Sequence, residues 1–195
     1  MDAHIIDLTQ PSIYLVFAHI LFNPIYWNTV ARSEYNNKTL TKLAGGNPYR
    51  GCYGLAVSIF VLGLTRDYLY HQAISVQPTH PFFDQYIIQI SAVLLFITGN
   101  ILVLSSMWAL GITGTYLGDY FGILMKERVT GFPFNVCDNP MYIGSTCTFL
   151  ATALWYKSPA GVVLTSIVYV VYRIALFFEE PFTGMIYSNK DNKKK

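Results

Sequence analysis

The sequence predicts an all-α integral membrane protein: a small helical bundle with a re-entrant or interfacial first helix, two central spans and a C-terminal helical hairpin. Hydrophobic residues make up 53% of the 195 residues and charged residues only 12%, whereas an ordinary soluble domain has roughly 25% charged residues. Residues 85–118 contain no charged side chain at all. Apolar segments recur along the chain, at about 11–31, 51–70, 86–110, 143–156 and 160–178. We therefore expect a single transmembrane domain over residues 1–195, ending in a basic tail at 188–195.

Composition excludes several classes of protein. The net charge is only +2, so no nucleic-acid partner is expected. The three cysteines (Cys52, Cys137 and Cys147) match no C-x-x-C spacing and the histidines are scattered, so we expect neither a disulfide framework nor a bound metal. The first ten residues carry acids where a signal peptide has a basic region, which indicates insertion through an internal, retained segment.

The first three apolar segments differ in how clearly they predict a membrane-spanning helix. Pro24 interrupts the first segment and removes a backbone donor, so a re-entrant or interfacial helix is as well supported as a span. Residues 51–65 would cover about 22 Å at 1.5 Å per residue, against a hydrocarbon core of roughly 30 Å. They span only if Arg50 and Arg66 extend to the interfaces. Residues 86–110 form the clearest span.

Positive charges choose between two topologies for residues 142–178, which are too long for one span and are broken at YKSPAG, residues 156–161. With a single last span, Lys and Arg divide seven against five between the two faces. With a helical hairpin, ten lie on one face and only Arg66 and Lys157 on the other, and such a bias marks the cytosolic side. We expect the hairpin, which brings the loop at 114–142 and the EEPF stretch at 179–182 to one cytosolic interface.

Glu179 and Glu180 lie next to each other at the predicted end of the last apolar run. Carboxylates at the edge of a bilayer are costly unless they are solvated or paired, so they are functional candidates. The alternative is that they only mark a helix end. Negative charge at a helix C-terminus opposes the helix dipole, so a cationic partner is expected nearby. Pro181 is expected to stop the helix directly after the pair.

The loop at 114–142 is more aromatic than a plain connector. Asp138-Asn139-Pro140 predicts a turn followed by a helix start. There, Asp138 or Asn139 would cap the helix, or the free N–H groups would receive an anionic group. Four rings of this region form either a box for an organic cation, through cation–π contacts, or an interfacial belt. These rings are Tyr116, Tyr120, Phe121 and Tyr142.

Three stretches together carry a resemblance to a known family: FNPIYWN at 22–28, residues 103–145, and EEPF. The sequence resembles the phospholipid N-methyltransferase family of the endoplasmic reticulum, and its fungal members most closely, over about residues 22–187. The resemblance implies a multi-pass enzyme of the endoplasmic reticulum membrane, including its contact regions with mitochondria. It also implies S-adenosylmethionine as methyl donor, no metal, and a membrane phospholipid as substrate.

The reaction that this resemblance implies is N-methylation of the headgroup amine of phosphatidylethanolamine derivatives, ending at phosphatidylcholine. The likeness to fungal members favours the monomethyl and dimethyl lipids as acceptors, with phosphatidylethanolamine itself left open. The family's Glu-Glu pair falls on Glu179 and Glu180, which would hold hydroxyl and amino groups of the cofactor. Its Gly-x-Gly motif falls on Ile97-Thr98-Gly99, where only the last residue matches.

The NPMYIG stretch is similar to the turn that isoprenylcysteine carboxyl methyltransferases use in their cofactor site. This similarity adds Asn139 and Tyr142 to the cofactor residues.

Methyl transfer from a sulfonium to an amine depends mainly on positioning. The amine, whose pKa lies near the lysine value of about 10.4, must first lose a proton. Asp119 and Glu180 are the candidate proton acceptors, with Asp119 and Tyr120 nearer the headgroup. The candidate substrate contacts are Tyr116, Lys126 and Arg128; the two cations either hold the lipid phosphate or only serve topology.

Two other functions stay open at this point, and the sequence does not indicate an oligomeric state. A carboxyl methyltransferase of prenylated cysteine would have an anionic substrate and a cation-rich pocket, whereas the loop here is aromatic and acidic. A non-catalytic membrane scaffold would leave the two adjacent glutamates without a role.

Overall fold

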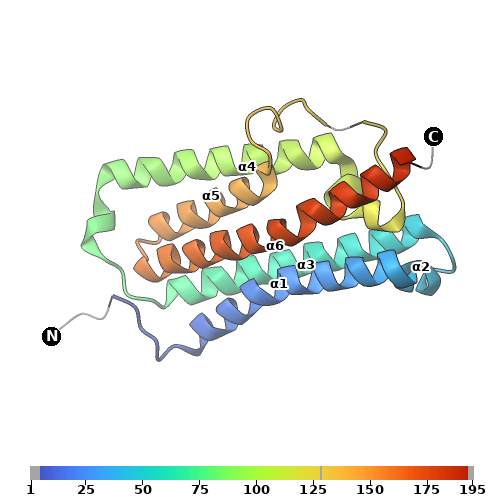
Figure 1. Ribbon diagram of the computed structural model, residues 1–195. Coiled ribbons are helices and arrows are strands. Elements are labelled where there is room, and N and C mark those ends of the chain that lie inside the picture. Colours follow the sequence, from blue (N-terminus) through green and yellow to red (C-terminus); the bar gives the residue numbers. More distant parts are fainter. Residues whose placement is uncertain (1–4, 128, 193–195) are drawn as a thin grey trace.

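The computed structural model describes residues 5–127 and 129–192 and consists of helices joined by turns and loops, so the predicted all-α class is confirmed (Figure 1). The helices are α1 (Pro11–Asn37), α2 (Thr39–Leu43), α3 (Pro48–Ser75), α4 (Tyr86–Thr115), α5 (Pro140–Trp155) and α6 (Pro159–Asn192), with short 3₁₀ turns η1 (Pro81–Asp84) and η2 (Gly118–Phe121). The long helices lie side by side, with α2 and the C-terminal end of α6 at one end of the bundle.

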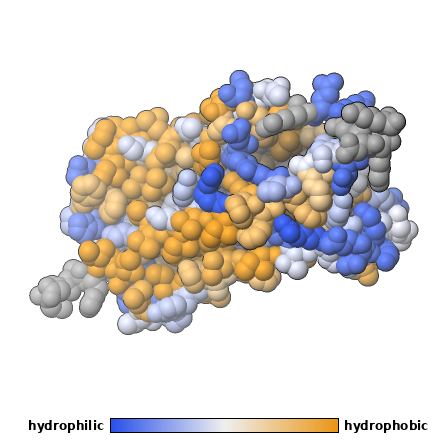
Figure 2. Space-filling view, in the orientation of Figure 1, coloured by the Kyte–Doolittle hydropathy of each residue, from blue (hydrophilic) through white to orange (hydrophobic). Residues whose placement is uncertain are grey.

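Within the part of the chain that the structure describes, three helical segments are long and apolar enough to cross a membrane: Pro48–Ser75, Tyr86–Phe121 and Pro159–Asn189. Their outward side chains include large hydrophobic ones, such as Trp108 of α4, which is 91% exposed. Hydrophobic residues cover much of the face shown in Figure 2, and hydrophilic residues gather toward the end that carries α2. Because a soluble monomer rarely exposes so much apolar surface, the bundle is built to lie in lipid.

α1 is one continuous helix that passes through Pro24, so the expected interruption there is wrong. Asn28 Nδ2 donates to the Pro24 carbonyl (3.1 Å), and Asn23 Nδ2 donates to a carbonyl of α3 (3.3 Å). Ile20 before the proline and Ala31 after it are both buried against the bundle. Because these contacts hold the helix on either side of Pro24, the missing N–H does not end it, and no re-entrant turn forms.

Capping and glycine chemistry shape α3 and α4. The Asn47 side chain accepts from the backbone N–H groups of Tyr49 and Arg50 (3.0 and 3.2 Å), and Pro48 occupies the first turn, so α3 starts ahead of the predicted segment. α4 is kinked at Gly111, whose φ of 65° and ψ of 179° suit glycine. Soon after this kink the chain turns into η2.

α5 and α6 form the predicted helical hairpin, with the turn inside the predicted break at 156–161. In this turn Lys157 has a left-handed φ of 54°, and Ser158 N donates to the Ala153 carbonyl (3.0 Å). Gly161 approaches α5 so closely that an added Cβ would lie 2.8 Å from Ala153 Cβ. Lys157 also forms an ion pair with Asp84 of η1. The two connections at this end of the bundle are therefore tied together.

α6 does not stop at Pro181 but continues through it to the end of its range, so the predicted helix stop is wrong. Just before the proline, the Arg32 guanidinium of α1 donates to the Phe178 carbonyl (2.9 Å). Just after it, the Phe182 ring packs edge-on against Tyr35 (ring centroids 5.1 Å apart) and lies under the Arg32 guanidinium (4.7 Å). Since α1 holds α6 on both sides of Pro181, tertiary packing outweighs the local effect of the proline.

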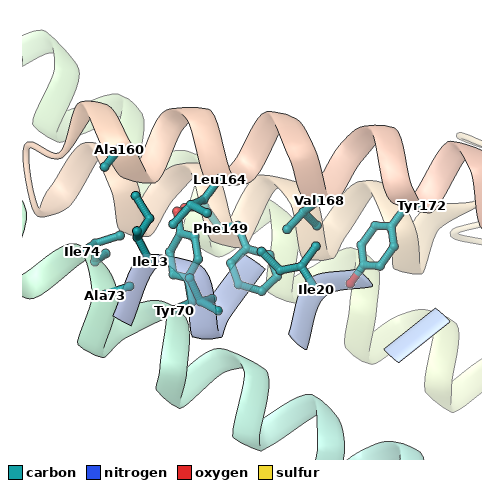
Figure 3. Packing of buried hydrophobic residues seen from close by; sticks show 11 residues of the cluster. Ile13, Ile20, Tyr70, Ala73, Ile74, Phe149, Ala160, Leu164, Val168 and Tyr172 are labelled. Atoms are coloured by element: carbon teal, nitrogen blue, oxygen red, sulfur yellow. The ribbon is translucent and has the colours of Figure 1, made fainter. Parts of the chain in front are cut away.

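Two buried clusters of side chains join the helices. The first connects α1, α3, α5 and α6 (Figure 3); in it the Tyr70 ring packs edge-on against Phe149 (4.7 Å), and the Tyr70 hydroxyl donates to the Gly161 carbonyl (2.9 Å). The second connects α1, α3, α6 and η2, and buries Tyr120 and Phe121. Because η2 is packed into this second cluster, the residues that follow α4 have a fixed position.

Candidate active site

A cavity of about 510 Å³ is lined by the five long helices and by residues of the loop between α4 and α5. This volume falls in the range of small-molecule sites, roughly 300–1,000 Å³. Four carboxylates line it: Asp67, Asp119, Asp138 and Glu179. Among the described lining residues, Arg66 is the single Lys or Arg. The excess of negative charge suits a positively charged ligand.

Glu179 lies within α6 and lines the cavity. Trp27 Nε1 and Asn28 Nδ2 of α1 donate to its Oε1 (2.5 and 3.1 Å). The Tyr142 hydroxyl of α5 donates to its Oε2 (2.7 Å). Because α6 continues past this residue, the dipole argument for a cationic partner does not apply; three neutral donors from two helices hold the carboxylate instead.

Glu180 follows about 100° further round the helix and is not among the residues that line the cavity. Its side chain is exposed, and its Oε1 accepts from Asn139 Nδ2 (2.9 Å). Asn139 directly precedes α5 but its side chain makes no capping bond, so the predicted Asn139 cap is wrong. The Asn139 amide instead joins the loop to α6. The two predicted cofactor residues Asn139 and Tyr142 thus contact one glutamate each.

Asp119 lies in η2 and lines the same cavity. Thr183 Oγ1 donates to Asp119 Oδ2 (2.9 Å). Since Thr183 is four residues after Glu179, both lie on one face of α6, and Asp119 stands one helical turn along from the Glu179 carboxylate. The predicted meeting of this loop with the EEPF stretch is confirmed by these contacts.

The predicted aromatic box is not complete. Tyr116 and Tyr142 line the cavity, but Tyr120 and Phe121 do not. Tyr120 is fully buried and its ring stacks on Phe182 (5.0 Å between centroids, 13° between planes). Phe121 is 4% exposed in the same cluster. Tyr120, expected near the headgroup, therefore lies behind the cavity wall and helps to hold η2 in place.

Ile97-Thr98-Gly99, the predicted cofactor motif, is also outside the cavity lining. Ile97 and Thr98 are exposed, whereas Gly99 is buried at the crossing of α4 with α5. A Cβ added to Gly99 would lie 2.6 Å from the carbonyl oxygen of Gly144. The glycine is therefore needed for the close approach of two helices, one turn away from Val103, which does line the cavity.

Of the two cations predicted to hold the lipid phosphate, the one that the structure describes is not part of the cavity wall. Lys126 is exposed and is not a lining residue, and Arg128 lies outside the described residues. Over residues 5–127 and 129–192, no three His, Cys, Asp or Glu side chains gather as a metal site requires.

Four residues of the site were missed by the sequence reasoning: Trp27, Asn28, Thr183 and Arg66. Trp27 and Asn28 belong to the FNPIYWN stretch, so the resemblance contained a signal for them, although not for their contact with Glu179. Arg66 was interpreted as a cation that extends to the membrane interface. In the structure its guanidinium turns into the cavity instead.

Residues 87–190 match the model of the phospholipid methyltransferase family. The chain is 55% identical over 192 residues to the phosphatidyl-N-methylethanolamine N-methyltransferase of Saccharomyces cerevisiae, covering 98% of this chain and 93% of the relative. It is 53% identical to phosphatidylethanolamine N-methyltransferase A of Dictyostelium discoideum (97% and 92% covered) and 48% identical to the phosphatidylethanolamine N-methyltransferase of Rattus norvegicus (95% and 92% covered). No solved structure matches the chain.

Proposed function

Because the chain belongs to the phospholipid methyltransferase family, we propose that it transfers methyl groups from S-adenosylmethionine to the headgroup amine of phosphatidylethanolamine derivatives. The monomethyl and dimethyl lipids are the proposed acceptors and phosphatidylcholine the final product. The names of relatives that cover nearly the whole chain support this substrate class. The proposed location is the endoplasmic reticulum membrane, as the resemblance implies.

The observation that carries the proposal is the acidic cavity around Glu179. Both partners of the reaction are cationic before they react, since the donor is a sulfonium and the amine is protonated near pH 7. Four carboxylates of the cavity wall would attract both. A prenylated cysteine carboxylate would be repelled by the same wall, so this second function has no support here.

Glu179, Glu180, Asn139 and Tyr142 form the proposed cofactor side of the site. Their hydrogen bonds to one another present two carboxylates and an amide at the junction of α5 and α6, which fits the hydroxyl and amino groups of S-adenosylmethionine. When bound, this molecule supplies an electrophilic methyl group on a positively charged sulfur. The protein then needs mainly to hold the acceptor nitrogen in line with that group.

Asp119 is the proposed proton acceptor. It lines the cavity, and the bond from Thr183 orients its carboxylate one turn along α6 from the cofactor side. A carboxylate in this position can bind the ammonium headgroup and take its proton before the neutral amine attacks. Glu180, the other sequence candidate, accepts from Asn139 but does not itself line the cavity, so Asp119 is better placed for this role.

The lipid has a route to this site through the wall between α3 and α4. Phe60 and Leu64 of α3 line the cavity and are 52% and 54% exposed. Val103 and Met107 of α4 line the cavity from the other side. Acyl chains could therefore remain in the bilayer along these apolar side chains while the headgroup enters.

Methyl transfer itself is the test. Purified protein would be incubated with labelled S-adenosylmethionine and micelles of each of three acceptors: phosphatidylethanolamine, its monomethyl form and its dimethyl form. Transfer to the monomethyl and dimethyl lipids is expected, and none to a prenylated cysteine used as control. If label reaches none of the lipids, the proposed function is wrong.

A further inference from the structure

Arg66 is a charged residue inside a helix that is apolar enough to span the membrane. Its side chain is only 12% exposed and it lines the cavity as the single Lys or Arg among the described lining residues. An ionisable side chain within a span is costly and normally faces a partner or a functional cavity. Arg66 therefore needs a reason beyond the topology of α3.

The contacts of Arg66 leave part of its hydrogen-bonding capacity unused. Nη1 donates to the Tyr172 hydroxyl of α6 (2.5 Å), while Nε and Nη2 donate to Asp67 Oδ1 (3.0 and 2.9 Å). The Phe149 ring lies 4.8 Å from the guanidinium carbon. Since a guanidinium carries five N–H donors, one N–H on each Nη is left after these three bonds. The guanidinium is therefore positioned by the Tyr172 hydroxyl and by the Phe149 ring over which it lies.

Arg66 and Glu179 are separated along the bundle axis. The Tyr172 hydroxyl, which contacts Arg66, belongs to a residue seven positions before Glu179 on α6, or about 10 Å at 1.5 Å per residue. Tyr172 packs edge-on against Tyr142 (4.9 Å), whose hydroxyl bonds Glu179. Tyr172 stands at the edge of the first buried cluster (Figure 3). Arg66 and the proposed cofactor side thus lie at two levels of one cavity.

We propose that Arg66 binds the phosphate of the substrate lipid, an inference that rests on the proposed function. A phosphodiester carries one negative charge on two free oxygens, which matches the fork of a guanidinium. With the phosphate at Arg66, the acyl chains lie along Leu64 and Phe60, about half a turn and just under two turns earlier on the same helix. The amine then extends along the cavity toward the level of Glu179, about 10 Å from Tyr172 at 1.5 Å per residue. In this proposal Arg66 has the phosphate-binding role that the sequence suggested for Lys126, which does not line the cavity.

A purely structural role for Arg66, as a tie between α3 and α6, is the competing explanation. Arg66→Gln removes the charge and keeps amide donors for Tyr172 and Asp67. Arg173→Gln is the matched control, because Arg173 is an exposed cation of α6 that does not line the cavity. Arg66→Gln should raise KM for the dimethyl lipid by about tenfold or more and leave the Kd for S-adenosylmethionine within about twofold. Arg66→Lys should recover part of the loss, and Arg173→Gln should behave as the unmodified protein.

Competition with lipids that lack an amine tests the phosphate directly. Phosphatidylmethanol carries a phosphodiester and no amine, and diacylglycerol carries neither. Phosphatidylmethanol should inhibit the unmodified protein more strongly than diacylglycerol does, and this difference should shrink in Arg66→Lys and vanish in Arg66→Gln.

Two outcomes would overturn the assignment. One is an Arg66→Gln protein that binds S-adenosylmethionine normally and keeps its lipid KM. If that variant fails to fold, the second outcome decides: equal inhibition by the two competing lipids, or a difference that Arg66→Lys leaves unchanged. Methyl transfer to no lipid by the unmodified protein would instead reject the proposed function, so the two failures are distinguishable.

Discussion

Glu179 and Glu180 are neighbours in sequence but have different surroundings. Consecutive helical residues point about 100° apart, so Glu179 enters the cavity while Glu180 faces Asn139. Glu179 is held by three donors from α1 and α5, whereas Glu180 has one and is exposed. The two glutamates therefore make separate contacts, and the α6 helix fixes their positions relative to each other.

Glutamine substitutions at Glu179 and Glu180 should separate the effect on cofactor binding from the effect on stability. Glu179→Gln places an NH₂ group where a carboxylate oxygen accepts hydrogen bonds, so it should lower the free energy of unfolding by about 1–3 kcal/mol and weaken S-adenosylmethionine binding at least tenfold. Glu180→Gln keeps an acceptor for Asn139 and should weaken cofactor binding with a smaller loss of stability. Calorimetric titration and thermal unfolding in micelles measure both quantities. Unchanged cofactor affinity in both variants would remove the pair from the site.

Single residues also show where sequence reasoning stops. The sequence identified Glu179, Asp119 and Tyr142 as candidate site residues, and all three line the cavity. It could not find the donor Trp27, because the contact with Glu179 joins residues 152 positions apart and depends on how α1 packs against α6. Nor could it separate Tyr116, which lines the cavity, from Tyr120, which does not, since the chain turns between them with a left-handed φ of 59° at Leu117.

Helices were predictable from their apolar runs, but their ends were not. Pro24 and Pro181 are both read locally as breaks, yet α1 and α6 pass through them because side chains on each side of the proline pack against neighbouring helices. The hairpin break at 156–161 was predictable, because a long apolar run and the charge distribution indicated it independently. Local rules therefore failed where side chains on both sides of a proline pack against other helices.

The crossing of α4 and α5 gives a prediction about the family's glycine motif. Gly99→Ala would push a methyl group against the Gly144 carbonyl, so it should lower the free energy of unfolding by about 1–3 kcal/mol. Thr98→Ala, at an exposed position beside it, should change neither stability nor cofactor affinity by much. Thermal unfolding and calorimetric titration of the two variants check this. Weaker cofactor binding by Thr98→Ala without a change in stability would favour the direct contact that the resemblance implies.

α3 offers a matched pair of glycines for testing the lipid route. Gly63 lines the cavity and Gly54 does not, and no heavy atom lies within 4 Å of an added Cβ at either. Gly63→Phe should fill the passage beside Phe60 and Leu64 and reduce kcat/KM for the dimethyl lipid by roughly tenfold or more, with cofactor affinity retained. Gly54→Phe should leave both unchanged. Equal kcat/KM in the two variants would mean that the lipid enters elsewhere.

The whole molecule has two unlike ends. One end is closed by the α5–α6 turn, where Lys157 pairs with Asp84 and its carbonyl accepts from His80 N (3.0 Å). At the other end the loop after α4, the second cluster and the later half of α6 surround the cavity. A water-soluble methyl donor and a lipid can meet only if the cavity end reaches an aqueous face of the membrane.

Orientation in the membrane is therefore testable with one label. A cysteine at position 157 on a background without Cys52, Cys137 and Cys147 should react with an impermeant maleimide only when the lumen is opened, because ten Lys and Arg favour the opposite face as cytosolic. A cysteine at the exposed position 126 should react from the cytosol without permeabilisation. Labelling of position 157 in sealed vesicles would show that the protein has the opposite orientation.

The acidic wall also has a consequence for the order in which lipids leave. Each methyl group added to the headgroup nitrogen removes one N–H while the ammonium charge stays the same. Carboxylates such as Asp119 therefore lose a hydrogen-bond donor at every round, and a quaternary headgroup offers them charge alone. A site that holds its ligand by carboxylate hydrogen bonds retains partly methylated lipids longer than the finished one, so the proposed enzyme favours completing the series over releasing its intermediates.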